Sequence, residues 1–526
     1  MNKLSFIIAL YLLPCTLLAQ TDDAQKYAAT ITGADLRKHL TVIAGAEMEG
    51  RETGTPGQRK AAAYIESQFK LSGLQAPQQL NGYQQTFPIF KDTLLNTSLK
   101  IGKKNYVFGD DFILNPSAAE NGEIKSRQII FVGYGIADSN YNDYAGKDAS
   151  GKIVVFFTGE PKSNGTYLVT GTEKSSSWGF GGMARKAAVA KENGALAALV
   201  INPTMEKILP GFVESARKTN VYLPRDENEK VNYATILPAV AKEIFGEKLF
   251  NDMLNKARAS EPLNSTTVEV KSKTKFVYEK QQIPNFASNV VGFIEGSDKK
   301  DEYVFLTAHY DHLGKQGNKI YYGADDDGSG TVGVLEMAEA FAKAKAEGKG
   351  PRRSIVFMTV SGEEKGLWGS EYYSDHPIFP LEKTTVDLNT DMVGRVDTER
   401  KNADSLNYVY VIGHDRLSSD LQPISEGIDD KYSKLKLDYK FDDPNDKERI
   451  YTRSDHYNFA RKGVPILFFY DGMLKADYHK PTDTVDKINW DLYEKRVRYI
   501  FLVAWEIANR ENMLKRDISL PETDMR

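Results

Sequence analysis

The second half of the chain repeatedly places histidine or carboxylate side chains where an apolar run ends. His309 follows the apolar residues 304–306, and Asp311 lies two positions further along. A metal-bound imidazole usually donates its second ring N–H to a carboxylate, which fixes its tautomer, so this spacing fits a ligand and its orienting partner. A histidine at a strand end with an unrelated aspartate nearby is the alternative. The neighbouring His312 is interpreted as a bystander.

Two runs of adjacent carboxylates follow. Asp325, Asp326 and Asp327 stand in a row within a glycine-rich segment, and their mutual repulsion would raise their pKa values unless a cation lies nearby. One aspartate can cap the helix that follows, but capping does not require three. Glu363 and Glu364 close another apolar run, and adjacent carboxylates can divide two tasks, one binding metal and the other accepting a proton. A solvated pair at a strand end is the simpler alternative.

Two further segments complete the set. Asp391 ends another apolar run, and His479 follows Tyr478 in a loop. Either segment alone is weak evidence, because a loop histidine beside a tyrosine is more often a surface contact than a ligand. The chain has only seven histidines, however, and two of them fall in these segments. Imidazole and carboxylate donors are those that zinc prefers, and a bridging carboxylate suits two metals about 3.5–4 Å apart.

Strands and helices alternate from about residue 270 onward. The sequence predicts strands at 289–296, 302–311, 353–364, 385–394, 408–415 and 464–472. It predicts helices at 330–346, 366–376 and 489–511. This alternation indicates an α/β fold with a mixed, largely parallel sheet flanked by helices. Ligands of such sheets bind beyond the carboxyl ends of the strands, so the polar residues at these ends should converge on one site.

The first 19 residues are typical of a secretory signal peptide. Lys3 is followed by the apolar residues 4–18, a run that is short for a membrane span, and Ala19 suits the cleavage position. We therefore expect a secreted or periplasmic protein. A lipoprotein anchor at Cys15, the only cysteine, is the less favoured alternative. No later stretch is long and apolar enough to predict a membrane span.

Length and composition indicate a multidomain globular protein. The chain has 526 residues, of which 41% are hydrophobic and 27% charged, and this length suggests two or three domains. The formal net charge is −4 with no evident basic face, so no nucleic-acid partner is expected. The predicted division is a signal peptide at 1–19, the N-terminal part of the main domain at 24–115, an inserted domain at 116–265, and the rest of the main domain at 266–515.

The inserted segment and the main domain each resemble a known family. The runs GYGI, NDYAGKDASGKIVV and ILPAVAKEIF resemble a protease-associated domain, a β-rich module found within secreted peptidases. The ordered segments HYD, GADDDGSG, SGEEKGLWGS, NTDMVG and YHKPTDT resemble the signature series of the co-catalytic zinc exopeptidases. That family includes bacterial leucyl aminopeptidase and aminopeptidase Y, with glutamate carboxypeptidase, glutaminyl cyclase and the transferrin receptor as more distant relatives.

The resemblance implies two zinc ions per chain and a role for each polar residue. It implies that His309 and Asp391 hold one zinc, that Glu364 and His479 hold the other, and that Asp326 bridges them. Asp325 and Asp327 would then support the site from outside or cap the next helix.

The resemblance also implies the residues that carry out catalysis. Glu363 would be the base, Asp311 would orient His309, and Tyr478 would stabilise the tetrahedral intermediate. Arg453 is either an anchor for a substrate carboxylate or a surface ion-pair residue.

These features predict a zinc-dependent exopeptidase that hydrolyses peptides through a metal-activated water, with an aminopeptidase preferred. A carboxypeptidase or dipeptidase with the same metal centre is the alternative. A glutaminyl cyclase or a non-enzymatic receptor-like module is less favoured, because the full ligand set is present. The inserted domain is either a lid or a stabilising appendage, and the sequence does not determine the oligomeric state.

Overall fold

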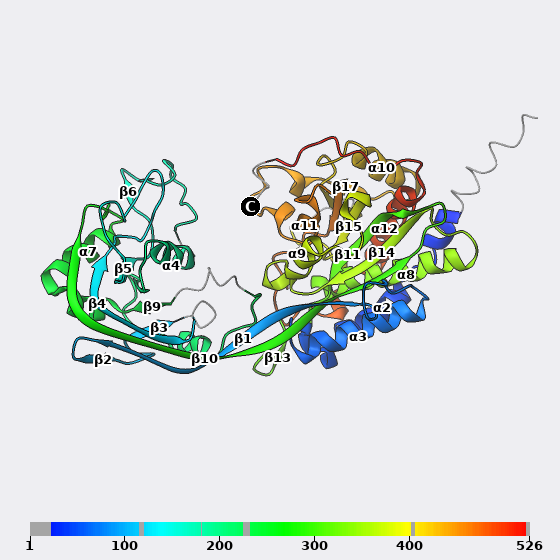
Figure 1. Cartoon of the computed structure of the whole chain (residues 1–526). Helices are drawn as coiled ribbons and strands as arrows, with labels where there is room; N and C mark the ends of the chain where they lie inside the picture. The colour runs from blue at the N-terminus through cyan, green and yellow to red at the C-terminus, as the bar shows by residue number, and fades with distance from the viewer. Residues whose placement is uncertain (1–22, 115–119, 180, 225–231, 401–405, 522–526) are drawn as a thin grey trace, which may run out of the picture. The chain divides into compact units, whose positions relative to one another are not determined.

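The computed structural model describes residues 23–114, 120–179, 181–224, 232–400 and 406–521 (Figure 1). The predicted signal peptide and Cys15 lie outside these residues. Within the described ranges, no helix combines the length and apolar character needed to cross a membrane. The chain divides into two compact units, of which unit 1 comprises Met1–Phe87 and Phe286–Arg526 and unit 2 comprises Pro88–Asn285.

Unit 1 contains a mixed, largely parallel sheet, as predicted. Its strand order is β17-β16-β18-β15-β11-β14-β10. The central strands β14, β11, β15 and β18 pair in parallel, whereas β10 is antiparallel to β14 and β16 is antiparallel to β18. The bounds are β10 (Val268–Ile294), β11 (Lys299–His309), β14 (Arg353–Val360), β15 (Thr384–Thr390), β16 (Tyr408–Ile412), β17 (Lys436–Asp438) and β18 (Ile466–Tyr470), with a separate hairpin of β12 (Lys315–Gln316) and β13 (Lys319–Ile320).

Helices flank this sheet and bury its faces. Every residue of β14, β15 and β18 is buried, which is typical of parallel strands covered on both faces. Helices α8 (Gly330–Ala346) and α12 (Trp490–Asn509) pack against β11 and β14, and α2 (Gly33–Ile43) and α3 (Pro56–Leu71) pack against α8 (Figure 1). Helices α9 (Trp368–Asp375) and α11 (His456–Ala460) contact each other, and α11 packs on β15 and β18; α10 (Leu421–Ile428) packs on α12.

The N-terminal helices have clear start signals. The Thr32 side chain accepts a hydrogen bond from the Asp35 N–H at the start of α2, and Thr55 caps α3 in the same way. Helix α2 ends at Ile43. Residues 46–51 form a tight turn in which Gly50 has φ 69°, and a Cβ at Gly50 would collide with the Gly314 carbonyl oxygen.

Arg51 connects this turn to the loop that precedes the triple aspartate. Its side chain is fully buried, and its guanidinium donates to the backbone carbonyls of Ile43 at 2.8 Å, Tyr310 at 2.7 Å, Tyr322 at 2.7 Å and Gly323 at 2.9 Å. The planar guanidinium has five N–H donors and can bond to several separated acceptors at once, whereas the compact ammonium group of a lysine cannot. Arg51 therefore fixes the positions of three separate backbone segments relative to one another.

Unit 2 is an α/β domain with its own core. Strands β4, β5, β8 and β9 pair in parallel, β3 pairs antiparallel with β9, and the first part of β10 pairs with β4. Phe131, Phe157, Phe245 and Phe250 stack in its interior. The bounds are β1 (Gln84–Ile101), β2 (Lys104–Tyr106), β3 (Phe112–Leu114), β4 (Gly122–Phe131), β5 (Ile153–Phe157), β6 (Lys162–Ser163), β7 (Thr166–Tyr167), β8 (Ala197–Ile201), β9 (Tyr233–Ile236), α4 (Met183–Glu192), α5 (Pro210–Arg217), α6 (Pro238–Phe245) and α7 (Glu247–Arg258).

Unit 2 is wider than the predicted insertion at 116–265. The long strands β1 and β10 belong in large part to it, and sequence patterning does not reveal them as part of the insertion because they run through its boundaries. Unit 2 also contains four helices among the described residues, so it is less purely β-rich than expected. Its assignment as a protease-associated domain stays a prediction.

We predict that Arg51→Lys destabilises unit 1 by about 2–4 kcal/mol, because several buried carbonyls lose a charged donor. Urea unfolding followed by tryptophan fluorescence would measure the change. Arg59→Lys, on the exposed side of α3, is the matched control and should change the free energy of unfolding by less than about 0.5 kcal/mol. Equal stability of the two variants would contradict the role given to Arg51.

Candidate metal centre

The strand ends meet at one edge of the unit 1 sheet, as predicted. Strand β11 ends at His309, Glu363 follows β14, and Asp391 follows β15 directly. These three strands are parallel neighbours, so their carboxyl ends share an edge. The loop of residues 324–329, which carries the three aspartates, leads from this edge into α8.

Asp326 lies between two imidazoles. Its Oδ1 is 3.3 Å from His309 Nε2, and its Oδ2 is 3.2 Å from His479 Nε2. One carboxylate thus faces two nitrogen donors through its two different oxygens. This is the arrangement expected of a carboxylate shared by two cations.

A second carboxylate accompanies each imidazole. Asp391 Oδ1 lies 3.6 Å from His309 Nε2, and Glu364 Oε2 lies 3.0 Å from His479 Nε2. The structure therefore brings all five predicted ligands together, in the two pairs and with the shared residue that the resemblance implied.

The donor set fits cations better than it fits hydrogen bonding alone. Asp326 Oδ2 and Glu364 Oε1 are buried and face imidazole nitrogens, with His479 Nε2 at 3.2 Å from the first oxygen and His312 Nδ1 at 2.8 Å from the second. Donor atoms that share a tetrahedral zinc at about 2.0–2.1 Å lie roughly 3.3–3.5 Å apart, and the Asp326 oxygens lie 3.3 and 3.2 Å from their imidazole nitrogens. Zinc is the metal that this mixture of imidazole and carboxylate donors suits.

His312 lies within the site, which corrects its interpretation as a bystander. Its ring is fully buried, and its Nδ1 is 2.8 Å from Glu364 Oε1 and 3.7 Å from Asp326 Oδ2. The HYDH spacing was the available signal. It was not used because a strand-end turn does not reveal which of two nearby imidazoles faces the edge of the sheet.

The imidazoles determine the charge of the shared carboxylate. Burial alone would raise the pKa of Asp326, but His312, His309 and His479 together hold it well below its ordinary value. Asp326 is therefore ionised, as a metal ligand must be.

Glu363 faces the same centre but stands apart from the ligand pairs. Its Oε2 lies 3.8 Å from His309 Nε2, and its side chain lines a pocket beside His309, Asp326 and Asp391. Burial raises the pKa of Glu363 well above its ordinary value, and the Glu364 and Asp391 carboxylates add to this against the opposing effect of His309. A carboxyl group with a raised pKa is suited to accept and return a proton near neutral pH.

Asp311 supports both His309 and Glu363. The His309 Nδ1 is 3.1 Å from the Asp311 backbone carbonyl and 3.7 Å from its carboxylate. The carboxylate itself accepts from the Thr53 hydroxyl at 2.6 Å and from the Glu363 N–H at 3.2 Å. Asp311 thus meets His309 mainly through its backbone, whereas its side chain positions the glutamate pair.

The other two aspartates of the triplet bind backbone. Asp327 accepts from the N–H groups of Gly330, at the start of α8, and Met392, at 2.7 and 3.0 Å. Asp325 accepts from the Gly394 N–H at 2.9 Å. These contacts fasten the aspartate loop to the segment after β15, so both residues position Asp326.

Asp483 is a positioning residue that sequence reasoning missed. Its carboxylate accepts from the backbone N–H groups of Asp325 and Asp326 at 3.1 Å each, and it is fully buried. The segment YHKPTDT was recognised for its histidine, but the sequence contains no signal that its last aspartate binds a loop more than 150 residues away.

Tyr478 lies beside the pocket, next to Arg453. The Arg453 guanidinium donates to the Tyr478 hydroxyl at 3.3 Å and lies 3.7 Å from Glu448, and both Tyr478 and Arg453 line the pocket. The preceding Asp477 anchors this loop through ion pairs with Arg395 at 2.9 Å and Lys487 at 2.7 Å. Arg453 is therefore a pocket residue and not only a surface one.

Residues matching known proteins coincide with this site. Residues 289–504 match the model of Peptidase family M28, a segment that contains every residue of the metal centre described above. This match agrees with the resemblance drawn from the sequence.

Individual relatives match over part of their length. A protein described as "Probable leucine aminopeptidase" from Arthroderma otae is 29% identical over 215 residues, covering 40% of this chain and 55% of that protein. Aminopeptidase YwaD from Bacillus subtilis is 27% identical over 238 residues, covering 44% and 46%. The chain thus spans about half the length of the curated relatives it matches.

A solved structure supports the fold across both units. The aminopeptidase from Aneurinibacillus sp. strain AM-1 covers 95% of this chain and 99% of its own, with a TM-score of 0.54 and 20% sequence identity. This similarity confirms the α/β fold class predicted from the sequence.

We predict that Asp483→Ala lowers zinc affinity by roughly 10–100-fold, because loss of an outer-shell partner leaves Asp326 less well placed. Zinc titration of the demetallated protein against a chromophoric chelator would measure the change. Asp486→Ala, three residues away and exposed, should leave the affinity unchanged, and equal affinities for both variants would refute the positioning role.

Proposed function

We propose that the chain is a zinc-dependent exopeptidase that removes N-terminal residues from peptides. The observation that carries the proposal is the position of Asp326 between His309 and His479, with Glu363 facing the adjacent pocket. The names of the matched relatives from Arthroderma otae and Bacillus subtilis describe aminopeptidases, which supports the same activity here.

Two zinc ions suit the donor set. His309 and Asp391 would hold one, Glu364 and His479 the other, and Asp326 would be shared between them. Bound zinc supplies a water of lowered pKa and polarises the carbonyl of the scissile peptide bond. His312, which faces Glu364 and Asp326, keeps these two carboxylates in position.

The protein's own groups then move the protons. Glu363 accepts a proton from the attacking water and returns it to the leaving amine, for which its raised pKa is suited. Burial, together with the charges of Asp326, Glu364 and Glu363, raises the pKa of Tyr478 well above its ordinary value. Tyr478 therefore stays protonated and can donate a hydrogen bond to the oxyanion that develops on the carbonyl.

A free amine has a partner in the pocket that is not assigned to zinc. Zinc would neutralise Asp326 and Asp391, which leaves the Glu363 carboxylate in the lining, whereas the Arg453 guanidinium already donates to Tyr478. A substrate ammonium group would complement this charge. A carboxypeptidase or dipeptidase with Arg453 as the anchor is the second candidate, because Arg453 does line the pocket.

Much of the remaining lining of the pocket is apolar. Met392, Ile450, Phe468 and Leu474 face the same space as the metal-centre residues. An apolar wall next to convergent polar groups is typical of a site that binds an apolar side chain and orients it by polar contacts. We therefore propose a preference for apolar N-terminal residues such as leucine.

Export from the cytoplasm is part of the proposal. It rests on Lys3, the apolar residues 4–18 and Ala19, the pattern of a secretory signal.

We predict that Glu363→Gln lowers kcat by about 10²–10⁴-fold while zinc content is unchanged, because the amide keeps the shape of the side chain but cannot accept a proton. Hydrolysis of leucyl-p-nitroanilide and metal analysis of the same sample would test this. Glu382→Gln, an exposed glutamate, is the control. Near-normal turnover in Glu363→Gln would refute its assignment as the base.

Blocked peptides separate the two candidate activities. We expect acetylation of the N-terminus of a leucine-containing tripeptide to abolish its cleavage, and amidation of the C-terminus to have little effect, because the pocket is suited to an ammonium group. Product analysis by mass spectrometry would identify which bond is cleaved. The opposite pattern would indicate a carboxypeptidase, and cleavage of a leucine-containing dipeptide but not of the unblocked tripeptide would indicate a dipeptidase.

A further inference from the structure

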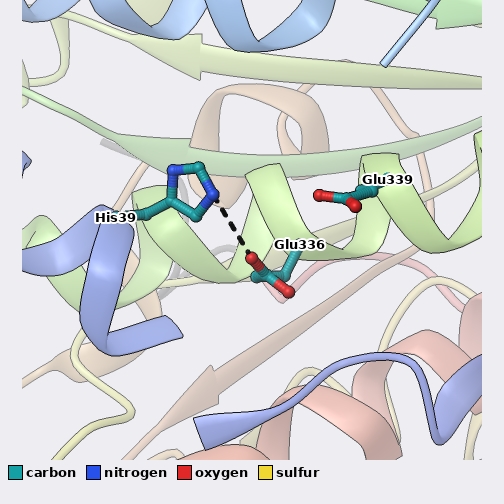
Figure 2. Close-up of side chains that lie close together, drawn as sticks. All are labelled: His39, Glu336 and Glu339. Atoms are coloured by element: carbon teal, nitrogen blue, oxygen red, sulfur yellow. Dashed lines mark ion pairs between the residues drawn. The ribbon is translucent and has the colours of Figure 1, made fainter. Parts of the chain in front are cut away.

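A second group of possible metal donors lies in unit 1, away from the pocket. It consists of His39 on α2 and of Glu336 and Glu339 on α8, and we refer to it as the helix cluster (Figure 2). Glu336 and Glu339 are three residues apart and so lie on the same face of α8. One donor atom from each of the three residues lies within 4.8 Å of the others.

The spacing within the helix cluster is too wide for a hydrogen bond. His39 Nε2 lies 3.5 Å from Glu336 Oε1, whereas a charge-assisted N–H to carboxylate bond is about 2.7–2.9 Å long. Two donors bound to one tetrahedral zinc at about 2.0–2.1 Å lie roughly 3.3–3.5 Å apart. The observed separation fits two ligands that share a cation.

Glu336 is buried without the partner that a buried carboxyl group requires. It is 3% exposed, and its Oε1, which points toward His39 in Figure 2, has no hydrogen-bond partner within the described residues. Leaving such an oxygen unpaired destabilises the fold, and more so when the group is charged. A cation between Glu336, His39 and the more exposed Glu339 would remove this cost.

The second nitrogen of His39 is held as in a metal-bound imidazole. His39 Nδ1 is 2.7 Å from the Tyr64 hydroxyl of α3, so the ring can donate its Nδ1–H there and present a bare Nε2 toward Glu336. A ligating histidine usually donates its other N–H to an oxygen in this way. Tyr64 thereby links α3 to the pair formed by α2 and α8.

The charges around the helix cluster agree with this arrangement. Burial lowers the pKa of His39, and Lys38 adds to the effect against Asp35, so the ring is neutral and able to bind a metal. Burial raises the pKa of Glu336 to about 8, with Glu339 and Asp35 adding to it against Lys38. Without a cation, the Glu336 carboxyl group is therefore largely protonated at neutral pH, and binding of a cation would release its proton.

We propose that His39, Glu336 and Glu339 form a separate structural site for one divalent cation of the zinc type, which fastens α2 to α8. The site lies in the helices and not in the pocket, and Glu339 leaves its outer side open to a water ligand. Glu336 lies six residues along α8 from Gly330, about 9 Å at 1.5 Å per residue. A cation here would hold the helix that extends from the aspartate loop.

Zinc content of variants tests the proposal. The mature chain is freed of metal with a chelator, reloaded with zinc and freed of excess zinc, and metal per chain is then measured by mass spectrometry. We expect about three zinc ions in the unsubstituted protein and about two in Glu339→Gln, since two are assigned to the pocket. Leucyl-p-nitroanilide hydrolysis should be unchanged in Glu339→Gln, because Glu339 is outside the pocket.

Glu339→Gln is the primary variant because Glu339 is exposed, so its substitution does not disturb the core. His39→Gln removes the imidazole and should also lose one zinc, and Glu382→Gln is the exposed control that should keep all three. Hydrogen exchange provides a second readout. Zinc should slow exchange at residues 33–43 in the unsubstituted protein but have a smaller effect there in Glu339→Gln.

The outcomes separate this site from the pocket. A single zinc that is lost in Glu339→Gln would support the helix cluster and contradict the two-zinc pocket. Two zinc ions, both kept in Glu339→Gln and His39→Gln, would overturn the helix cluster and leave the pocket intact. Three zinc ions that are all kept in Glu339→Gln would also overturn it, because the third would then bind elsewhere.

Discussion

The concentration of buried negative charge at one edge of the unit 1 sheet is the constraint on which the rest of the structure depends. Asp311, Asp325, Asp327 and Asp483 are fully buried, and Asp326 nearly so. Such a group would repel itself and resist burial unless each carboxylate found a donor or a cation. Asp326 meets imidazoles, whereas the others meet backbone N–H groups or hydroxyls.

The carboxylates at this edge therefore fall into two kinds: those that hold backbone segments in place, and those that are available to bind metal or substrate. Carboxylates that bind backbone are saturated and rigid, and they fasten the aspartate loop to the segment after β15 and to the loop that ends in Asp483. Arg51 also fixes backbone segments near the site, because its guanidinium donates to four backbone carbonyls. The oxygens of Asp326 and Glu364, which face imidazole nitrogens, are the ones available to cations. Preorganised surroundings of this kind hold catalytic groups in place at little cost during the reaction.

The two groups of donors in unit 1 differ in the elements that carry them. Those of the pocket stand on strand ends and loops, where their backbone contacts orient them and solvent can enter. Those of the helix cluster stand on the sides of α2 and α8, where a cation would link elements that otherwise meet through apolar packing. The first arrangement suits chemistry on a substrate and the second suits stabilisation of the helices beside it.

Much of the fold and the five ligands of the pocket could be predicted from the sequence, since the signals involved are local. Buried parallel strands are continuous apolar runs, their carboxyl ends share an edge, and His309, Glu363 and Asp391 therefore had to meet. The wider bounds of unit 2, the burial of His312, the role of Asp483 and the helix cluster could not be predicted. Each depends on contacts between residues distant along the chain, which form only once helices and loops pack, and no periodicity or spacing within a short segment encodes them.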